Sequence, residues 1–210
     1  MLQRGLGGGE KTMFSEIRIA GFGGQGVILA AAVIGKAAAI FQGAYATMTQ
    51  SFGPEARGGS SSAQVILSSE PILYPYVARP DILVVMSQEA YTRFAPDLKP
   101  GGILIAEQDL VRIDQIPDGV RAYGVPATRL AEELGRKVVL NIVMVGFFGA
   151  VAKLLDPDAL RKAVADSVPP AMQKLNLQAF DKGFGFGQEL MVRLAENGDT
   201  DSVVATLEMV

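Results

Sequence analysis

Hydrophobic positions follow the period of a strand in some stretches of the chain and the period of a helix in others. Residues 17–20 alternate between apolar and polar, residues 21–26 are rich in glycine, and residues 27–41 form an alanine-rich apolar run with a single lysine. This order predicts a strand, a tight turn and a helix. Short runs of strand-forming residues predict further strands at 44–49, 63–67, 81–86, 103–106 and 120–123.

Helical patterns separate several of these strands and fill the last third of the chain. Ser87 is a suitable N-cap for a helix that follows the strand at 81–86, and another helix is predicted at 128–135. The last helices are predicted at 141–155, 158–166 and 171–195. Strands that alternate with helices at this spacing predict an α/β fold, Rossmann-like, with a largely parallel sheet flanked by helices and a helical C-terminal third.

The chain divides into a single domain with two short extensions. We expect a flexible leader at 1–16, one domain at 17–195, and a tail at 196–210 that is loose or faces a partner. The leader has no apolar stretch of the signal-peptide kind, which predicts a cytoplasmic protein. The apolar segments 21–41 and 138–152 are interrupted by glycines and polar residues, so we expect helices buried in the core and no membrane span.

Composition narrows the chemistry that the chain can perform alone. The sequence has 19 Lys plus Arg against 22 Asp plus Glu, so it offers no broad basic surface for nucleic acid. It has no cysteine and no histidine, which excludes disulfides, thiolate-bound iron–sulfur clusters and histidine-based catalytic triads. We therefore expect a chain that binds a cofactor or completes another chain's active site, and that holds no metal itself.

A high apolar content suggests exposed surface that partner chains cover. The sequence is 49% hydrophobic, and the last predicted helix carries Phe180, Phe184 and Phe186. We expect these phenylalanines to pack in the core or to lie at a subunit interface.

The glycines after the first strand have the spacing of a dinucleotide-binding turn. Gly21, Gly23 and Gly26 fit the G-x-G-x-x-G pattern, in which backbone amides at a helix start approach a phosphate. The usual acidic residue at the end of the second strand is absent from 46–50, which disfavours NAD. NADP bound through Arg57, and glycines needed only for packing, remain open alternatives.

A second motif at 53–59 combines glycines with a cation. Its glycines permit backbone that gathers amides into one concavity, and Arg57 adds a planar charged group that suits phosphate or carboxylate. The alternative is a solvated turn in which Arg57 pairs with Glu55. Asn141 is the lone polar residue of an apolar helix, so it is expected to cap that helix or to bond to a neighbouring loop.

Three strings in this order resemble the gamma subunit of 2-oxoacid:ferredoxin oxidoreductases. They are RIAGFGGQGV at 18–27, SFGPEARGG at 51–59 and NIVMVG at 141–146. The resemblance implies a complex that decarboxylates a 2-oxoacid on thiamine diphosphate, passes electrons through iron–sulfur clusters to ferredoxin, and transfers the acyl group to coenzyme A. It places thiamine diphosphate and the clusters mainly on partner subunits, and the partners it implies are alpha and beta subunits and a ferredoxin-like delta subunit.

The same resemblance assigns the coenzyme A side of the reaction to this chain. It implies that coenzyme A is bound by the two glycine motifs and the later asparagine, that is, by Gly21, Gly23, Gly24, Gln25, Gly26, Arg57, Gly58, Gly59 and Asn141. The wording of the second motif favours 2-oxoglutarate as substrate over branched-chain 2-oxoacids, pyruvate and indolepyruvate. A free-standing NAD(P)-binding oxidoreductase and a non-catalytic scaffold subunit are the competing functions.

Overall fold

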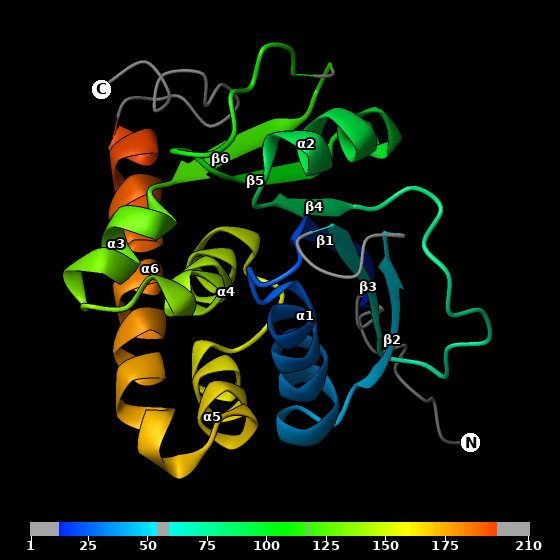
Figure 1. Cartoon of the computed structure of the whole chain (residues 1–210). Helices are drawn as coiled ribbons and strands as arrows, with labels where there is room; N and C mark the ends of the chain where they lie inside the picture. The colour runs from blue at the N-terminus through cyan, green and yellow to red at the C-terminus, as the bar shows by residue number, and fades with distance from the viewer. Residues whose placement is uncertain (1–12, 54–58, 117, 197–210) are drawn as a thin grey trace, which may run out of the picture.

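The computed structural model describes residues 13–53, 59–116 and 118–196, and its centre is a six-stranded sheet with helices on both faces (Figure 1). The strand order is β2-β3-β1-β4-β5-β6. The strands are β1 (Phe14–Phe22), β2 (Tyr45–Phe52), β3 (Ser60–Ser68), β4 (Ile82–Val85), β5 (Ile103–Glu107) and β6 (Arg121–Val125). β1 begins three residues before the predicted start of the domain at residue 17, because Phe14 to Glu16 pair with β3.

The predicted parallel arrangement is confirmed for β1, β4, β5 and β6, which form neighbouring parallel pairs. The β2–β3 hairpin is the exception, because β3 runs antiparallel to both β1 and β2. The connection 53–59 explains this, since a crossover between parallel strands needs about a dozen residues or more. The hairpin places the end of β2 and the start of β3 beside the end of β1.

The helices agree with the predicted ones to within a few residues at each end. Ser87 caps α2 as predicted, since its side chain accepts a hydrogen bond from the Ala90 amide. A π-helical turn at Ala37–Phe41 follows α1. The helices are α1 (Val27–Lys36), α2 (Gln88–Phe94), α3 (Ala127–Glu133), α4 (Leu140–Ala152), α5 (Pro157–Ser167) and α6 (Pro170–Glu196).

The two faces of the sheet are covered unequally. Helix α2 packs on one face, against β1 and β4, whereas α1, α3, α4, α5 and α6 share one hydrophobic core on the other face (Figure 1). Residues Asn141 to Val151 of α4 are all buried, as expected for this apolar segment. No helix in the described ranges combines the length and the apolar character that a membrane span requires.

Glycines let α4 and α6 cross at very short distance. A Cβ atom at Gly146 would overlap the carbonyl oxygen of Phe180, and one at Gly183 would overlap the carbonyl oxygen of Val143. This close crossing buries Phe180, which is 2% exposed. Of the two roles expected for these phenylalanines, core packing and a subunit interface, the structure gives Phe180 the first, because this side chain belongs to the chain's own core.

Large apolar side chains are instead exposed on other parts of the surface. Several belong to the strands β1 and β2 and to the connection between β3 and β4. These are Phe14 (59% exposed), Tyr45 (48%), Phe52 (63%), Leu73 (95%), Tyr74 (69%) and Tyr76 (59%).

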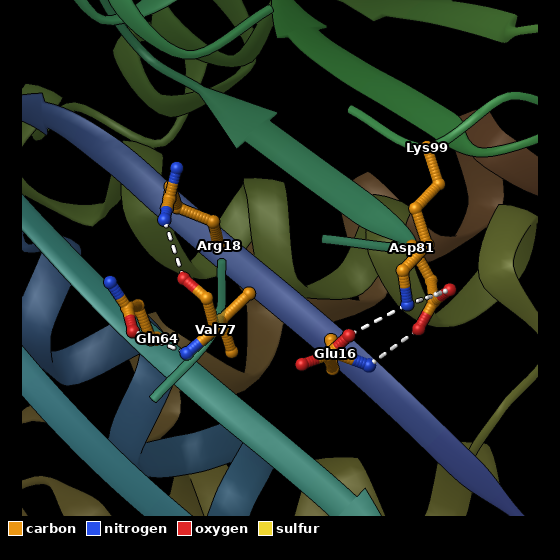
Figure 2. A network of polar contacts seen from close by, with 6 residues as sticks. All are labelled: Glu16, Arg18, Gln64, Val77, Asp81 and Lys99. Atoms are coloured by element: carbon orange, nitrogen blue, oxygen red, sulfur yellow. Dashed lines mark hydrogen bonds and ion pairs between the residues drawn. The ribbon is translucent and has the colours of Figure 1, made fainter. Parts of the chain in front are cut away.

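A polar network attaches the β3–β4 connection to the face of the sheet on which α2 packs (Figure 2). Arg18 of β1 is 5% exposed and donates to the Val77 carbonyl oxygen at 2.8 Å. The Val77 amide donates to Oε1 of Gln64 in β3, also at 2.8 Å. Arg18 donates in addition to Asp97 at 3.1 Å. Burial of the arginine is thus matched by charge-assisted hydrogen bonds.

Lys99 forms ion pairs at the other end of this group of polar contacts, near the start of β1. Its ammonium lies 2.6 Å from Glu16 and 2.9 Å from Asp81. Burial alone would lower the pKa of Lys99, but the hydrogen bonds to Glu16 and Asp81 raise that pKa above its ordinary value. Lys99 therefore remains charged and ties the start of β1 to the segment that leads into β4 (Figure 2).

Candidate functional site

The turn between β1 and α1 lies where the chain changes from one face of the sheet to the other. β1 and β4 are parallel neighbours, yet α1 packs on one face after β1 and α2 packs on the opposite face after β4. In open α/β sheets, ligands bind in the crevice at such a switch point, outside the carboxyl ends of the strands. The predicted glycine motif is thus at the expected position for a ligand.

Left-handed backbone shapes this turn. Gly24 has φ +96° and Gly26 has φ +75°, values that side chains other than glycine rarely adopt. Gly26 is the N-cap of α1 and provides no side-chain cap. Gly24 is exposed, and nothing lies within 4 Å of the position that a Cβ would take. The glycines therefore set the shape of the turn and leave its outer side open.

Gln25 holds the turn between the ends of two strands. Its Oε1 accepts a hydrogen bond from the Phe22 amide at 2.6 Å, and its Nε2 donates to the Met86 carbonyl oxygen at 2.7 Å. Gly21 leaves room for this side chain, because a Cβ there would lie 2.5 Å from Oε1. The side chain of Gln25 thus positions the turn at the crevice between β1 and β4.

Asn141 supports the same turn from the core. It is 3% exposed, and its Nδ2 donates to the Gly26 carbonyl oxygen at 3.2 Å. A Cβ at Gly26 would overlap this Nδ2. Asn141 was expected either to cap its own helix or to bond to a neighbouring loop, and in the structure it bonds to the neighbouring β1–α1 turn.

The second glycine motif lies directly beside the first. The Gly23 amide donates to the Gly59 carbonyl oxygen at 2.8 Å, and the Gly53 amide donates to the Ser60 carbonyl oxygen at 2.7 Å. The structure therefore brings together Gly21, Gly23, Gly24, Gln25, Gly26, Gly59 and Asn141 from three separate strings. Arg57 and Gly58 lie outside the described residues.

The turn presents unused hydrogen-bond donors. The amides of Gly24, Gly26, Val27, Ile28 and Leu29 have no partner among the described residues, whereas the Ala30 amide donates to the Gly26 carbonyl oxygen. The first turn of α1 contains no acidic residue. Free amides and the positive end of the helix dipole both favour an anion at this position.

A polar cleft of about 140 Å³ adjoins the turn on the α2 side of the sheet. It lies between α2, the end of β2 and the start of β3, and Gly21 is one of its lining residues. Its other lining residues are Ser51, Phe52, Gly53, Ser60, Ser61, Ser62, Glu89, Ala90, Arg93 and Phe94. The helix α2 was predicted from the sequence, but its place at this cleft was not, because nothing in the pattern of α2 shows which strands it faces.

Glu107 is a buried carboxylate at the same edge of the sheet, and its hydrogen bonds give it a structural role. It is 0% exposed and accepts hydrogen bonds from the Leu110 amide at 2.7 Å and the Thr128 amide at 2.9 Å. Burial raises the pKa of Glu107, and the hydrogen bonds from Thr128 and Leu110 oppose that shift. These contacts join the end of β5 to the start of α3.

Comparison with known proteins identifies the family to which this sequence is similar. Residues 16–186 match the family model of pyruvate ferredoxin/flavodoxin oxidoreductase. The 2-oxoglutarate synthase subunit KorC of Methanocaldococcus jannaschii is 46% identical over 180 residues, which cover 85% of this chain and 96% of KorC. KorC of Methanothermobacter thermautotrophicus is 50% identical, with coverage of 80% and 92%.

Solved structures show the same arrangement of strands and helices. The gamma subunit of a keto/oxoacid ferredoxin oxidoreductase from Geobacter sulfurreducens superposes with a TM-score of 0.73 at 37% identity, covering 83% of this chain and 99% of that one. The 2-oxoglutarate:ferredoxin oxidoreductase of Magnetococcus marinus, with 2-oxoglutarate, coenzyme A and succinyl-CoA bound, gives 0.77 at 28% identity. It covers 86% of this chain and 32% of that longer chain. This chain belongs to the pyruvate ferredoxin/flavodoxin oxidoreductase family.

Proposed function

We propose that this chain is the gamma subunit of a 2-oxoglutarate:ferredoxin oxidoreductase, in which it contributes the coenzyme A side of the active site. The choice of 2-oxoglutarate is supported by the order of the identities. They are 46%, 50% and 49% for three 2-oxoglutarate synthase subunits, 37% for a ketoisovalerate oxidoreductase subunit, 34% for a fourth 2-oxoglutarate synthase subunit, and 31% for a pyruvate synthase subunit. The three highest of these identities therefore all belong to 2-oxoglutarate synthase subunits. A free-standing NAD(P) oxidoreductase is not supported, because these relatives are subunits of larger enzymes.

The reaction would convert 2-oxoglutarate, coenzyme A and oxidised ferredoxin into succinyl-CoA, carbon dioxide and reduced ferredoxin. Thiamine diphosphate and the iron–sulfur clusters would be held by the alpha, beta and delta partner subunits. This assignment fits the composition, since a chain without cysteine or histidine lacks the usual cluster ligands. The cofactors then supply the electron chemistry, and this chain supplies binding and orientation.

The observation that carries the coenzyme A assignment is the set of unused amides at the β1–α1 turn. They would bind the diphosphate of coenzyme A, while Gln25 and Asn141 keep the turn in place. Arg57 and Gly58, outside the described residues, are proposed to line the same cleft. Fixing the diphosphate would orient the thiol toward the acyl group on the partner subunit, which favours transfer by proximity.

Substrate choice is tested on the assembled complex. Co-expression with the partner subunits should give coenzyme A-dependent ferredoxin reduction that is fastest with 2-oxoglutarate, compared with pyruvate and 3-methyl-2-oxobutanoate. Omission of this chain should abolish acyl-CoA formation. A complex that prefers another 2-oxoacid would overturn the substrate assignment.

The phosphate role of the turn is tested by a pair of variants at Gly24. Aspartate and asparagine have nearly the same shape, and both tolerate left-handed backbone better than other side chains. Gly24→Asp adds a negative charge beside the proposed diphosphate, so it should raise the Michaelis constant for coenzyme A by about tenfold relative to Gly24→Asn. The Michaelis constant for 2-oxoglutarate should be equal in the two variants. Equal constants for coenzyme A would show that the turn binds no phosphate.

A further inference from the structure

The two edge strands of the sheet differ in length and in exposure. Four of the five residues of β6 are buried, and β6 packs against α4 and α6. β2 has eight residues, most of them partly or fully exposed, and among the described residues it pairs with β3 alone. The amides and carbonyls on its outer side are therefore available to a strand from another chain.

β2 has none of the features that usually protect an edge strand. Natural edge strands avoid pairing with other chains by being very short or by carrying lysines or prolines. The stretch 37–53 contains no charged residue, and β2 contains no proline. An unprotected edge of this length indicates a surface that a partner covers.

An exposed apolar segment of the β3–β4 connection lies beside this edge. The hydroxyl of Thr49 in β2 and the amide of Val77 in the connection both donate to Oε1 of Gln64, which places the two segments next to each other. Residues 71–78 contain no charge. The large side chains that this segment exposes are Leu73, Tyr74 and Tyr76. We call β2 and residues 71–78 together the edge surface.

The connection is held in place although it exposes these side chains. Buried Arg18 donates to the Val77 carbonyl oxygen, and Lys99 pairs with Asp81 just before β4 (Figure 2). A surface that is already fixed loses less conformational entropy when a partner binds. The polar network thus prepares the edge surface for binding.

We propose that the edge surface binds the partner subunit that carries the acyl group, with an extended segment of that subunit alongside β2. The inference rests on the proposed function, in which coenzyme A on this chain meets an acyl group on a partner. Phe52 is the last residue of β2, is 63% exposed and lines the polar cleft beside the turn. A subunit that delivers an acyl group to this region must approach the same end of β2, which a second copy of this chain would cover.

The absence of charge on the edge surface defines the chemistry of the partner. Backbone hydrogen bonds along β2 and apolar contacts with residues 71–78 would hold the two chains together. An uncharged, apolar surface on the partner fits this arrangement, since a charged one would lose its hydration without gaining a counter-charge.

A pair of variants at Gln50 tests the role of the strand. Gln50 is an exposed residue of β2 that does not line the cleft. Lysine and methionine have similar lengths, but only lysine carries a charge that a neighbouring strand would bury. On dilution of the assembled complex, the concentration at which half of this chain dissociates should be about tenfold higher for Gln50→Lys than for Gln50→Met. Equal concentrations would overturn the proposal.

A second pair of variants tests the connection. Leu73 is 95% exposed and Val138 is 63% exposed, so neither substitution by serine removes a core contact. Val138 lies between α3 and α4, and α3 lies across the molecule from β2 (Figure 1). Leu73→Ser should raise the dissociation concentration by about tenfold, whereas Val138→Ser should leave it unchanged. The same effect in both variants contradicts the proposed surface.

The outcomes separate this inference from the function on which it rests. If Gln50→Lys weakens assembly while Gly24→Asp and Gly24→Asn have equal Michaelis constants for coenzyme A, the edge surface is correct and the coenzyme A role is wrong. If Gly24→Asp raises that constant while Gln50→Lys and Leu73→Ser leave assembly unchanged, the reverse holds. Disruption only of a dimer of the free chain would mean that the surface joins two copies, and the proposal would be wrong.

Discussion

Backbone conformation and a close side-chain contact both require glycine at position 26, and their effects on stability can be measured separately. Its φ of +75° strains any other side chain, and a Cβ would also overlap Nδ2 of Asn141. Gly24 has φ +96° but open space around it, so Gly24→Ala carries the backbone strain alone, at roughly 1 to 2 kcal/mol. We predict that Gly26→Ala lowers the free energy of unfolding by about 2 kcal/mol more than Gly24→Ala does, as measured in urea. Equal losses would mean that Asn141 does not fix the turn.

Glu107 gives the chain a pH dependence of known sign. Burial raises the pKa of Glu107 above the ordinary value of 4.5, so the folded state binds a proton more tightly than the unfolded state. Its contribution to stability is complete below pH 4.5 and is lost as the pH rises through the raised pKa. The free energy of unfolding of the natural chain, minus that of Glu107→Gln, should therefore fall as the pH rises. A difference that grows with pH would show that the two amide hydrogen bonds outweigh burial.

Single residues also show how far the sequence predicts the site. The glycine spacing was sufficient to predict the turn, because left-handed backbone leaves a direct signature in residue type. Asn141 was predictable as a polar group in need of a partner. The hydrogen bonds of Gln25 were not predictable, since its acceptor Met86 directly follows β4, a strand that becomes a neighbour of β1 only in the folded sheet.

At the scale of elements, the crossing of α4 and α6 is the most sensitive contact of the helical layer. Gly183 lies against the Val143 carbonyl oxygen, whereas Gly185, on the same helix, has no atom within 4 Å of its Cβ position. Gly183→Ala should separate the two helices and destabilise the chain by about 3 kcal/mol. Gly185→Ala should stabilise it by up to about 1 kcal/mol, because alanine favours the helix. Thermal unfolding of both variants compares them directly, and similar shifts in Tm would contradict the close crossing.

Element types were predictable because each follows from local periodicity, whereas strand direction was not. The runs at 44–49 and 63–67 were identified as strands, and they extend in the structure to Tyr45–Phe52 and Ser60–Ser68. An alternating pattern does not encode whether a strand runs parallel or antiparallel to its neighbour. The antiparallel direction of β3 matters for the candidate site, since the hairpin brings the second glycine motif beside the first.

At the scale of the whole molecule, the proposed binding crevice lies at one edge of the sheet. Helices α1, α3, α4, α5 and α6 contribute to the core on one face of the sheet, and α2 packs on the other face (Figure 1). The carboxyl edge of the parallel strands carries the turn, the adjoining cleft, and Gly53 and Gly59 of the second motif. The composition is consistent with the proposed division of labour, because a chain without cysteine or histidine lacks the usual iron–sulfur cluster ligands. Binding and orientation of coenzyme A is the task that this geometry fits.

The most direct test of that task is a structure of the assembled complex with coenzyme A bound. We expect diphosphate oxygens within about 3.2 Å of the amides of Gly24, Gly26, Val27, Ile28 or Leu29. A diphosphate held only by the partner subunits, with the β1–α1 turn empty, would contradict it.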